Sequence, residues 1–462
     1  MKKHIHLIGI GGTGLSAIAR LLHESGYAVS GSDQTMSPLA DALVKDGIRV
    51  IIGHRAENIA GADMIVRSSA ISDENPEVVA ANTNHIPVLK RSDFLGQLME
   101  KHTSIAVAGT HGKTTTTGLI AWMLSAMGLD PSYIVGGTVN QLGTNAHAGK
   151  GVHFVIEADE YDRMFLGLKP DISLITSMEL DHPDCFPTLA EYNGAFLQFA
   201  SSTRPGGTLL VCGDHANLRE LATKISSKGI MTSTYGVSTD CDYQATSIQL
   251  SETGVYQFDL ARKTTTDAKT LVSNIFLTIP GKHNLVNALA ALSVADQLGL
   301  DLITSASHVS SFTGTGRRFE IVAEDNGITL IDDYAHHPTE IKTTLAAVRS
   351  RYQSARIFAI WQPHTYSRTR LLRDQFVQAF SDANQTIVTE IYASREPKEA
   401  FSSIELVNLM NSSKTRFIPD LHAVTETLLK ELRPGDVVIV LSAGDANQIN
   451  ADLANALKGQ TL

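Results

Sequence analysis

The stretch SIAVAGTHGKT, from Ser104 to Thr114, indicates how the centre of this chain folds. Its small and apolar first half predicts a buried strand, and the glycines at 109 and 112 predict a tight turn into a helix. Such glycines let backbone N–H groups wrap phosphate oxygens, while a lysine adds charge and a threonine hydroxyl is available to Mg²⁺. The stretch therefore predicts an ATP site with contacts from Gly109, Thr110, His111, Gly112, Lys113, Thr114 and Thr115.

Strands and amphipathic helices alternate on both sides of this loop, which predicts parallel sheets covered by helices. Before the loop, HIHLIGI, YAVSGSD and DMIVRSS are predicted strands; after it, HFVIEAD, DISLITS and GTLLVCG are. Residues 242–279 alternate polar and apolar, which predicts antiparallel strands appended to the central sheet. Nearer the C-terminus come five further strand candidates: ITLIDDY, ARIFAIWQP, QTIVTEIY, TRFIP and DVVIVLSAG.

Three α/β domains account for the 462 residues, since single cores rarely grow beyond about 250–300 residues. We expect a Rossmann-like domain over residues 1–99 and a P-loop ATPase-type domain with the appended antiparallel strands over 100–313. A second Rossmann-like domain is expected over 314–462. The glycine pair in Gly314-Thr315-Gly316 predicts a flexible connection at the last boundary.

The composition excludes several classes of protein. Hydrophobic residues make up 43% and charged residues 19%, as in ordinary globular proteins, and the net charge of -10 argues against nucleic-acid binding. No apolar run approaches the roughly 20 residues of a membrane span, and three scattered cysteines fit neither a disulfide framework nor a zinc site. We expect a cytoplasmic monomer or homodimer that does not insert into membranes.

A second glycine-rich loop, GIGGTG at 9–14, lies near the N-terminus. It follows a strand and opens a helix, where backbone amides can approach a diphosphate. Asp33 ends the next strand, about where a dinucleotide fold places its ribose-binding acid. Alone the loop would predict NAD, and a purely structural turn is the other interpretation. The candidate contacts to the nucleotide diphosphate and its ribose are Gly11, Gly12, Thr13, Gly14 and Asp33.

The two loops together indicate an enzyme that holds two phosphorylated molecules. A dehydrogenase has no use for a Mg-ATP loop, and a simple kinase has no use for the N-terminal diphosphate loop. A ligase that binds a nucleotide-linked substrate at one site and ATP at another uses both.

At GTHGKTTT the chain resembles the Mur ligase and folylpolyglutamate synthetase superfamily, over nearly its whole length. GIGGTG at 9–14, DDYAHHPTE at 332–340 and QPHTYSRT at 362–369 are similar to the branch that adds L-alanine to UDP-N-acetylmuramate. The resemblance implies that the UDP-sugar lies against the N-terminal domain, that ATP binds the central one, and that the C-terminal domain closes over both. ATP with Mg²⁺ would convert the lactyl carboxylate into an acyl phosphate, which the alanine amine would attack.

The resemblance also implies catalytic roles for Lys113, Glu157 and His182, with Thr114, Glu157 and His182 contacting the metal. Asp159 and Glu160, which follow Glu157, could be substrate contacts or solvated charges, and we favour solvated charges. Several relatives carry a carbamylated lysine where this chain has Phe196, which leaves open what supplies the charge near a second metal.

Residues farther along the chain resemble nucleotide and substrate contacts. Asn284, Asn287, Arg318 and Asp333 resemble residues that hold ATP, although Asn284 could instead cap a helix. Of the adjacent His336 and His337, one is expected to be structural. The candidate contacts for the amino acid or muramate moiety are His336, His364 and Arg368, and some relatives have arginine at the position of Thr365.

Three rival interpretations remain at this point. A ligase that reattaches recycled murein tripeptide to the same UDP-sugar is the nearest, and QPHTYSRT speaks against it. An NAD-dependent oxidoreductase would leave the Mg-ATP loop unexplained. A nucleotide-binding scaffold that has lost its chemistry disagrees with the presence of Lys113, Thr114, Glu157 and His182.

Overall fold

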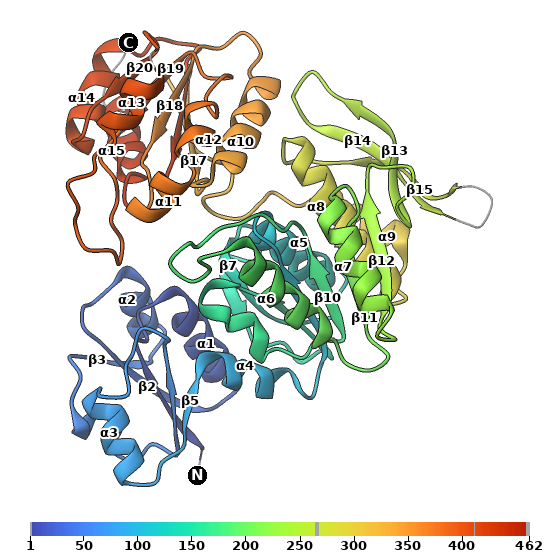
Figure 1. Ribbon diagram of the computed structural model, residues 1–462, viewed down its shortest axis with the longest axis vertical. Helices are drawn as coiled ribbons and strands as arrows, with labels where there is room; N and C mark the ends of the chain where they lie inside the picture. Colours follow the sequence, from blue (N-terminus) through green and yellow to red (C-terminus); the bar gives the residue numbers. More distant parts are fainter. Residues whose placement is uncertain (1, 264–267, 411, 459–462) are drawn as a thin grey trace.

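The computed structural model describes residues 2–263, 268–410 and 412–458 as three α/β lobes that follow one another along the chain. Figure 1 shows the N-terminal lobe in blue, the central lobe in teal to yellow, and the C-terminal lobe in orange and red. This architecture confirms the predicted fold class. No helix in the described ranges is both long enough and apolar enough to cross a membrane.

The N-terminal lobe contains a parallel sheet in the order β3-β2-β1-β4-β5. The apolar strand β1 lies in the middle, so the β1–α1 turn opens at the carboxyl edge, where open α/β sheets bind ligands. The elements are β1 His4–Ile8, α1 Thr13–Glu24, β2 Ala28–Asp33, α2 Pro38–Lys45, β3 Arg49–Ile52, η1 Ala56–Ile59, β4 Met64–Arg67, α3 Pro76–Thr83, β5 Val88–Lys90 and the connecting α4 Arg91–Met99.

The central lobe is built on a ten-stranded sheet in the order β15-β14-β13-β12-β11-β10-β6-β9-β7-β8. Strands β14 and β15 pair antiparallel, which confirms the appended antiparallel strands. The strands are β6 Thr103–Ala108, β7 Ser132–Val139, β8 Thr144–His147, β9 His153–Glu157, β10 Ile172–Ile175, β11 Thr208–Cys212, β12 Met231–Gly236, β13 Tyr243–Leu250, β14 Tyr256–Lys263 and β15 Ala268–Phe276. The helices are α5 Lys113–Ala126, η2 Tyr161–Gly167, α6 Leu189–Ser201, α7 Ala216–Ser226, α8 Lys282–Gln297 and α9 Leu302–Ser310.

The C-terminal lobe has a six-stranded sheet in the order β16-β17-β21-β18-β19-β20. The five predicted strands pair in parallel, but β16 adds an antiparallel edge that the sequence analysis missed. The strands are β16 Glu320–Asp325, β17 Ile328–Asp333, β18 Ile357–Trp361, β19 Gln385–Val388, β20 Thr415–Phe417 and β21 Val437–Leu441. The helices are α10 Pro338–Arg351, α11 Tyr366–Leu371, α12 Arg373–Val377, α13 Ile404–Met410, α14 Leu421–Glu431 and α15 Gln448–Lys458.

The three lobes are joined in different ways. One apolar cluster runs from the N-terminal lobe into the central one, bringing Ile18 of α1 together with Val135 and Val139 of β7. The two apolar clusters of the C-terminal lobe contain only its own residues within the described ranges. The C-terminal lobe therefore contacts the others mainly through polar groups and its linker.

The linker at Gly314-Thr315-Gly316 is not the flexible connection that its glycines predicted. Thr315 is fully buried, and its backbone bridges to Val139 of the central sheet. The Gly316 N–H donates to the Thr138 carbonyl at 2.8 Å. Tertiary hydrogen bonds thus fix a segment whose composition suggests mobility.

Candidate active site

The phosphate loop leaves the carboxyl end of β6 and ends where α5 begins at Lys113. Gly109 and Gly112 have φ values of +132° and +79°, which favour glycine. A Cβ on Gly109 would lie 2.1 Å from Thr176 Oγ1, so a larger residue does not fit. The loop and the positive end of α5 together form the kind of site that binds phosphate.

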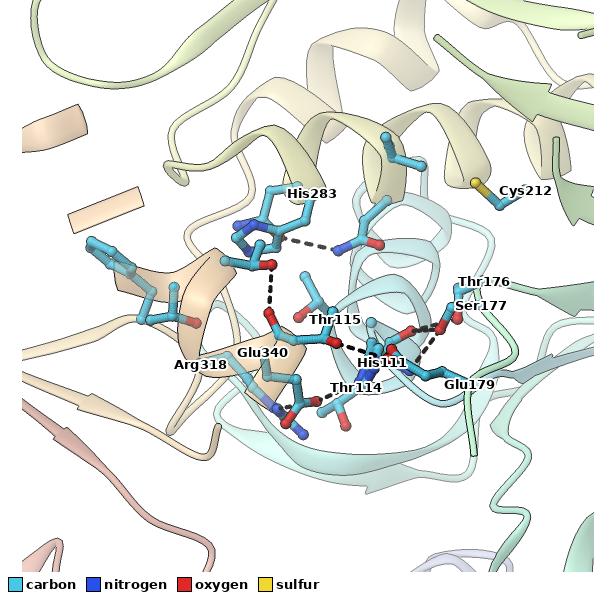
Figure 2. A pocket seen from close by; sticks show the side chains of 18 of the residues that line it. His111, Thr114, Thr115, Thr176, Ser177, Glu179, Cys212, His283, Arg318 and Glu340 are labelled. Atoms are coloured by element: carbon cyan, nitrogen blue, oxygen red, sulfur yellow. Dashed lines mark hydrogen bonds and ion pairs between the residues drawn. The ribbon is translucent and has the colours of Figure 1, made fainter. Parts of the chain in front are cut away.

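A cavity of about 540 Å³ opens beside this loop, between the central and C-terminal lobes (Figure 2). Its volume is in the range of small-molecule sites. Gly109, Thr110 and Lys113 are not among its lining residues, although they belong to the same loop. Eight of the predicted ATP contacts do line it: His111, Gly112, Thr114, Thr115, Asn284, Asn287, Arg318 and Asp333.

Two asparagines of α8 form one wall of the cavity. Asn284 Nδ2 donates to the Pro280 carbonyl at 2.7 Å, and Asn284 Oδ1 accepts from Asn287 Nδ2 at 3.1 Å. Gly281 occupies the N-cap position of α8, so the alternative in which Asn284 caps the helix is wrong. A Cβ on Gly112 would lie 2.8 Å from Asn287 Oδ1, which shows how closely the loop approaches α8.

The C-terminal lobe contributes the acidic side chain of Asp333 to the same cavity, and its linker contributes the basic side chain of Arg318. Asp333, at the end of β17, accepts from the backbone N–H groups of Phe319 and Ala335 at 2.7 and 2.8 Å. Burial raises the pKa of Asp333 to about 6, although Arg318 opposes the effect. The Arg318 guanidinium lies 3.7 Å from Glu340 Oε1. A nucleotide in the cavity would thus contact both lobes.

The Lys113 ammonium is held at the base of the loop by Glu160, with Nζ 2.8 Å from Oε2. It also donates to the carbonyls of Gly109 and Thr110. Burial lowers the pKa of Lys113, but Glu160 and Asp159 outweigh burial and raise it, so the lysine is charged. Glu160 is fully buried, and its interpretation as a solvated surface charge is therefore wrong.

Glu157, at the end of β9, lies against the loop and is suited to a metal. Its Oε1 accepts from Thr114 Oγ1 at 2.9 Å and its Oε2 from the Gly136 N–H at 2.6 Å. A half-buried carboxylate beside a hydroxyl offers the hard oxygen ligands that Mg²⁺ takes, so these two residues fit the ion. His182, the third predicted metal contact, lies near Glu160 instead, with Nε2 3.7 Å from Oε1.

A buried ion pair joins the central lobe to the C-terminal lobe. Arg368 Nε donates to Asp181 Oδ1 at 2.7 Å, and both side chains are only 4% exposed. Arg368 also donates to the His364 carbonyl at 2.8 Å, and its Nη2 lies 3.4 Å from His182 Nδ1. The rings of His336 and His364 are 5.9 Å apart. The structure thus brings the predicted substrate residues next to the predicted metal histidine.

His111 forms a second polar link between these lobes (Figure 2). Its Nε2 lies 2.9 Å from Glu179 Oε2, and its Nδ1 lies 3.2 Å from Glu340 Oε1 on α10. Burial lowers the pKa of His111, but the two carboxylates outweigh burial and raise it to about 9. His337, the structural member of the histidine pair, caps α10 by accepting from the Thr339 N–H at 3.3 Å. The sequence analysis missed both Glu179 and Glu340.

The N-terminal glycine loop lies in a separate lobe from this cavity. The Gly11 N–H donates to Asp33 Oδ2 at 2.9 Å, so Asp33 closes the loop. The Arg91 side chain lies against Gly14, where a Cβ would stand 1.7 Å from Arg91 Nη1. The five predicted diphosphate-side residues are therefore close together at the carboxyl edge of the first sheet: Gly11, Gly12, Thr13, Gly14 and Asp33.

The two positions that depart from the family pattern are both buried. Phe196 is fully buried and packs edge-on against Phe165, with ring centroids 5.2 Å apart. An aromatic core thus takes the place of the lysine that several relatives carry there. Thr365 is only 5% exposed, and its hydroxyl lies 3.3 Å from that of Ser367.

Comparison with known families covers almost the whole chain. Residues 4–103 match the model of the Mur ligase family catalytic domain, and residues 107–295 match the Mur ligase middle domain. Residues 317–444 match the glutamate ligase domain of Mur ligases.

Two curated relatives with similar sequences carry the same name. The chain is 40% identical over 460 residues to the UDP-N-acetylmuramate–L-alanine ligase of Geobacter sp. (strain M21), covering 99% of this chain and 98% of that protein. It is also 40% identical over 453 residues to the ligase of the same name from Sorangium cellulosum (strain So ce56), covering 96% and 94%.

Solved structures show the same architecture. The crystal structure of UDP-N-acetylmuramate-alanine ligase MurC from Thermotoga maritima is 27% identical, covers 99% of both chains and superposes with a TM-score of 0.81. A murein peptide ligase from Psychrobacter arcticus covers 100% of both chains with a TM-score of 0.71, and at 24% identity it shows a shared fold alone.

Proposed function

Because the chain belongs to the Mur ligase family and is an ATP-dependent ligase, we propose that it joins L-alanine to the lactyl carboxylate of UDP-N-acetylmuramate. The observation that carries this choice is full-length similarity to the alanine-adding ligases, and a cavity between two lobes that is lined by predicted ATP contacts supports it. The products are the amide, ADP and phosphate. We place this reaction in the cytoplasm, in a monomer or homodimer.

The proposed division of labour follows the three lobes. Residues 1–99 hold the UDP-sugar through the loop of Gly11, Gly12, Thr13 and Gly14 with Asp33, where backbone N–H groups face a diphosphate. Residues 100–313 bind ATP, and residues 314–462 close over both with contacts to the amino acid. Domain closure would bring the lactyl carboxylate to the terminal phosphate.

In the first step, the lactyl carboxylate oxygen attacks the γ-phosphorus of ATP, and ADP leaves. Two anions must meet here, so their repulsion has to be screened by fixed positive charge. Lys113 supplies one such charge at the base of the loop, and Arg318 a second at the lobe boundary. Mg²⁺ held by Thr114 and Glu157, with His182 nearby, would add Lewis-acid stabilisation of the phosphate oxygens when bound.

In the second step, the neutral amine of L-alanine attacks the acyl carbon, and phosphate leaves as the amide forms. We assign recognition of the alanine carboxylate to Arg368, because a guanidinium fork suits a carboxylate. His364 and His336 border this group. Burial lowers the pKa of both histidines to about 3, so they are neutral near pH 7 and do not favour a second positive charge beside Arg368.

The experiment that tests the proposal measures phosphate release from ATP and Mg²⁺ in the presence of UDP-N-acetylmuramate. L-alanine, the recycled murein tripeptide and no acceptor are compared side by side. Release that requires both the UDP-sugar and L-alanine is the expected result. Release with the tripeptide alone would favour the recycling ligase, and no release with any acceptor would refute the proposal.

A further inference from the structure

Three donor groups at the boundary of the central and C-terminal lobes are arranged as a metal site. Within the described residues, His111, Glu179 and His337 each place one donor atom within 4.8 Å of the other two. Two imidazoles and one carboxylate are a ligand set of zinc sites that keep a fourth position for water. We propose that these residues bind a divalent transition-metal ion of the zinc class, and that the bound ion holds the two lobes together.

Glu340 supplies the outer contact that such a site needs. His111 directs Nε2 at Glu179, 2.9 Å away, and Nδ1 at Glu340, 3.2 Å away. With the metal on Nε2, the ring proton stays on Nδ1, which lies 3.2 Å from Glu340 Oε1 but outside hydrogen-bond geometry in this structure. Histidine ligands of metals commonly make this second contact with a carboxylate, which fixes their tautomer and orientation. A carboxylate thus lies beside the His111 nitrogen that would not bind the ion, and a small rotation of either side chain would make this second contact.

The side chain of His337 independently indicates that a ligand binds here. Its side chain is 1% exposed, and its Nε2 has no hydrogen-bond partner among the described residues. Buried polar atoms are normally partnered. The His337 ring lies 4.8 Å from that of His111. Ligation at Nε2 would partner this atom, and the ring proton would move to Nδ1 at the expense of the 3.3 Å bond from Thr339.

Charge and access also fit a divalent transition metal. Glu179 offers a negative charge directly to the ion, and Glu340, which also faces Arg318, lies beside His111. His111 and Glu179 line the ATP cavity, so an ion can enter through it. Imidazole ligands favour Zn²⁺ or Co²⁺ over Mg²⁺, which takes oxygen ligands. This site is therefore chemically distinct from the Thr114–Glu157 pair.

The position of the site determines its effect. His111 belongs to the phosphate loop, whereas His337 precedes α10 of the C-terminal lobe. An ion bound to both would hinder separation of the lobes and crowd the phosphate loop. The bound ion would therefore oppose ATP turnover.

Metal binding is tested directly by titrating the metal-free full-length protein with CoCl₂, without nucleotide or Mg²⁺. The visible absorption of four-coordinate Co²⁺ reports occupancy. His337→Gln should weaken binding about 10–100-fold or more, as expected when a metal site loses a supporting group. His215→Gln is the matched control, because His215 lines the same cavity but is outside the group. Equal Co²⁺ affinity in the wild type and a folded His337→Gln variant would overturn the proposal.

A second variant and a second measurement guard against misfolding. Glu179→Gln keeps the shape of the side chain, and it should also weaken Co²⁺ binding while the melting temperature stays near that of the control. With saturating Mg²⁺ and ATP, Zn²⁺ should inhibit the wild type at lower concentration than it inhibits His337→Gln. If both proteins were equally sensitive, Zn²⁺ would be acting elsewhere, for example at Thr114 and Glu157, and the proposal would fail. The Co²⁺ titration requires no turnover, so its outcome is independent of the proposed ligase reaction.

Discussion

Glu77, in the first turn of α3, is a fully buried carboxylate in the N-terminal lobe whose charge can be removed. Its Oε2 accepts from Ser32 Oγ at 2.6 Å, and the Asn58 amide donates to its Oε1. The rings of His6 and His54 each place a nitrogen 3.6 Å from Oε2. Ser32 directly precedes Asp33, so this cluster supports the edge of the sheet where the proposed UDP-sugar loop lies.

Burial raises the pKa of Glu77, but His6, Ser32 and Asn58 outweigh burial and lower it from 4.5 to about 2. A lowered carboxyl pKa contributes stability that is fully present above about pH 4.5 and is lost as the pH falls toward 2. At 1.36 kcal/mol per unit of pKa, the contribution at pH 7 is about 3 kcal/mol. This agrees with the roughly 3–5 kcal/mol lost when a buried ion pair is broken.

Glu77→Gln should therefore lower the free energy of opening of the N-terminal lobe by about 3 kcal/mol at pH 7. The N–H donors of the glutamine amide would also face the Ser32 hydroxyl and the Asn58 amide, which already donate to this side chain. Hydrogen exchange in peptides from residues 4–33 should accelerate about a hundredfold, since 1.4 kcal/mol is a factor of ten. Glu57→Gln, at an exposed position in the same lobe, is the matched control. Exchange within a few-fold of the control would refute the reasoning.

Lys113→Ala should abolish phosphate release but leave UDP-sugar binding, measured by calorimetry, largely intact, because the lysine lies in another lobe; parallel loss of both would contradict the division of labour. Asp181→Asn should raise the KM for L-alanine more than the KM for ATP, since it removes the charge that positions the Arg368 guanidinium, and should lower stability by about 2–3 kcal/mol because asparagine can keep one hydrogen bond. Equal changes in the KM for L-alanine and the KM for ATP would count against this prediction. ADP affinity should fall as the pH drops through about 6, because protonated Asp333 is a poorer acceptor for a ribose hydroxyl. A flat fluorescence-titration profile from pH 7 to 5 would argue against that role.

The repeating apolar pattern predicted most of the fold, because strands buried on both faces are continuous apolar runs. ITLIDDY and DVVIVLSAG became β17 and β21, two paired interior strands of their sheet. The antiparallel β16 was missed because it lies at the sheet edge, where Glu320, Glu324 and Asp325 interrupt the apolar pattern. Burial at an edge depends on the neighbouring elements, which local sequence does not specify.

The candidate site was predictable where its residues are contiguous and less so where they meet across the fold. The phosphate loop follows from its own glycines and lysine, whereas Glu160 could be distinguished from the half-exposed Asp159 only by the tertiary structure. Glu340 likewise sits among charged and polar residues on α10, and its contact with His111 joins positions more than two hundred residues apart. A local sequence pattern cannot predict a contact between such distant positions.

The ion pair between Asp181 and Arg368 crosses the same lobe boundary as the proposed ATP cavity, which has a thermodynamic consequence. A ligand that binds the docked arrangement more tightly than the separated one shifts the docking equilibrium by its difference in affinity. If nucleotide and amino acid both favour the docked lobes, each must strengthen the binding of the other by the same factor. Cooperativity between two chemically unrelated ligands would then arise from one shared docking equilibrium, without direct contact between them.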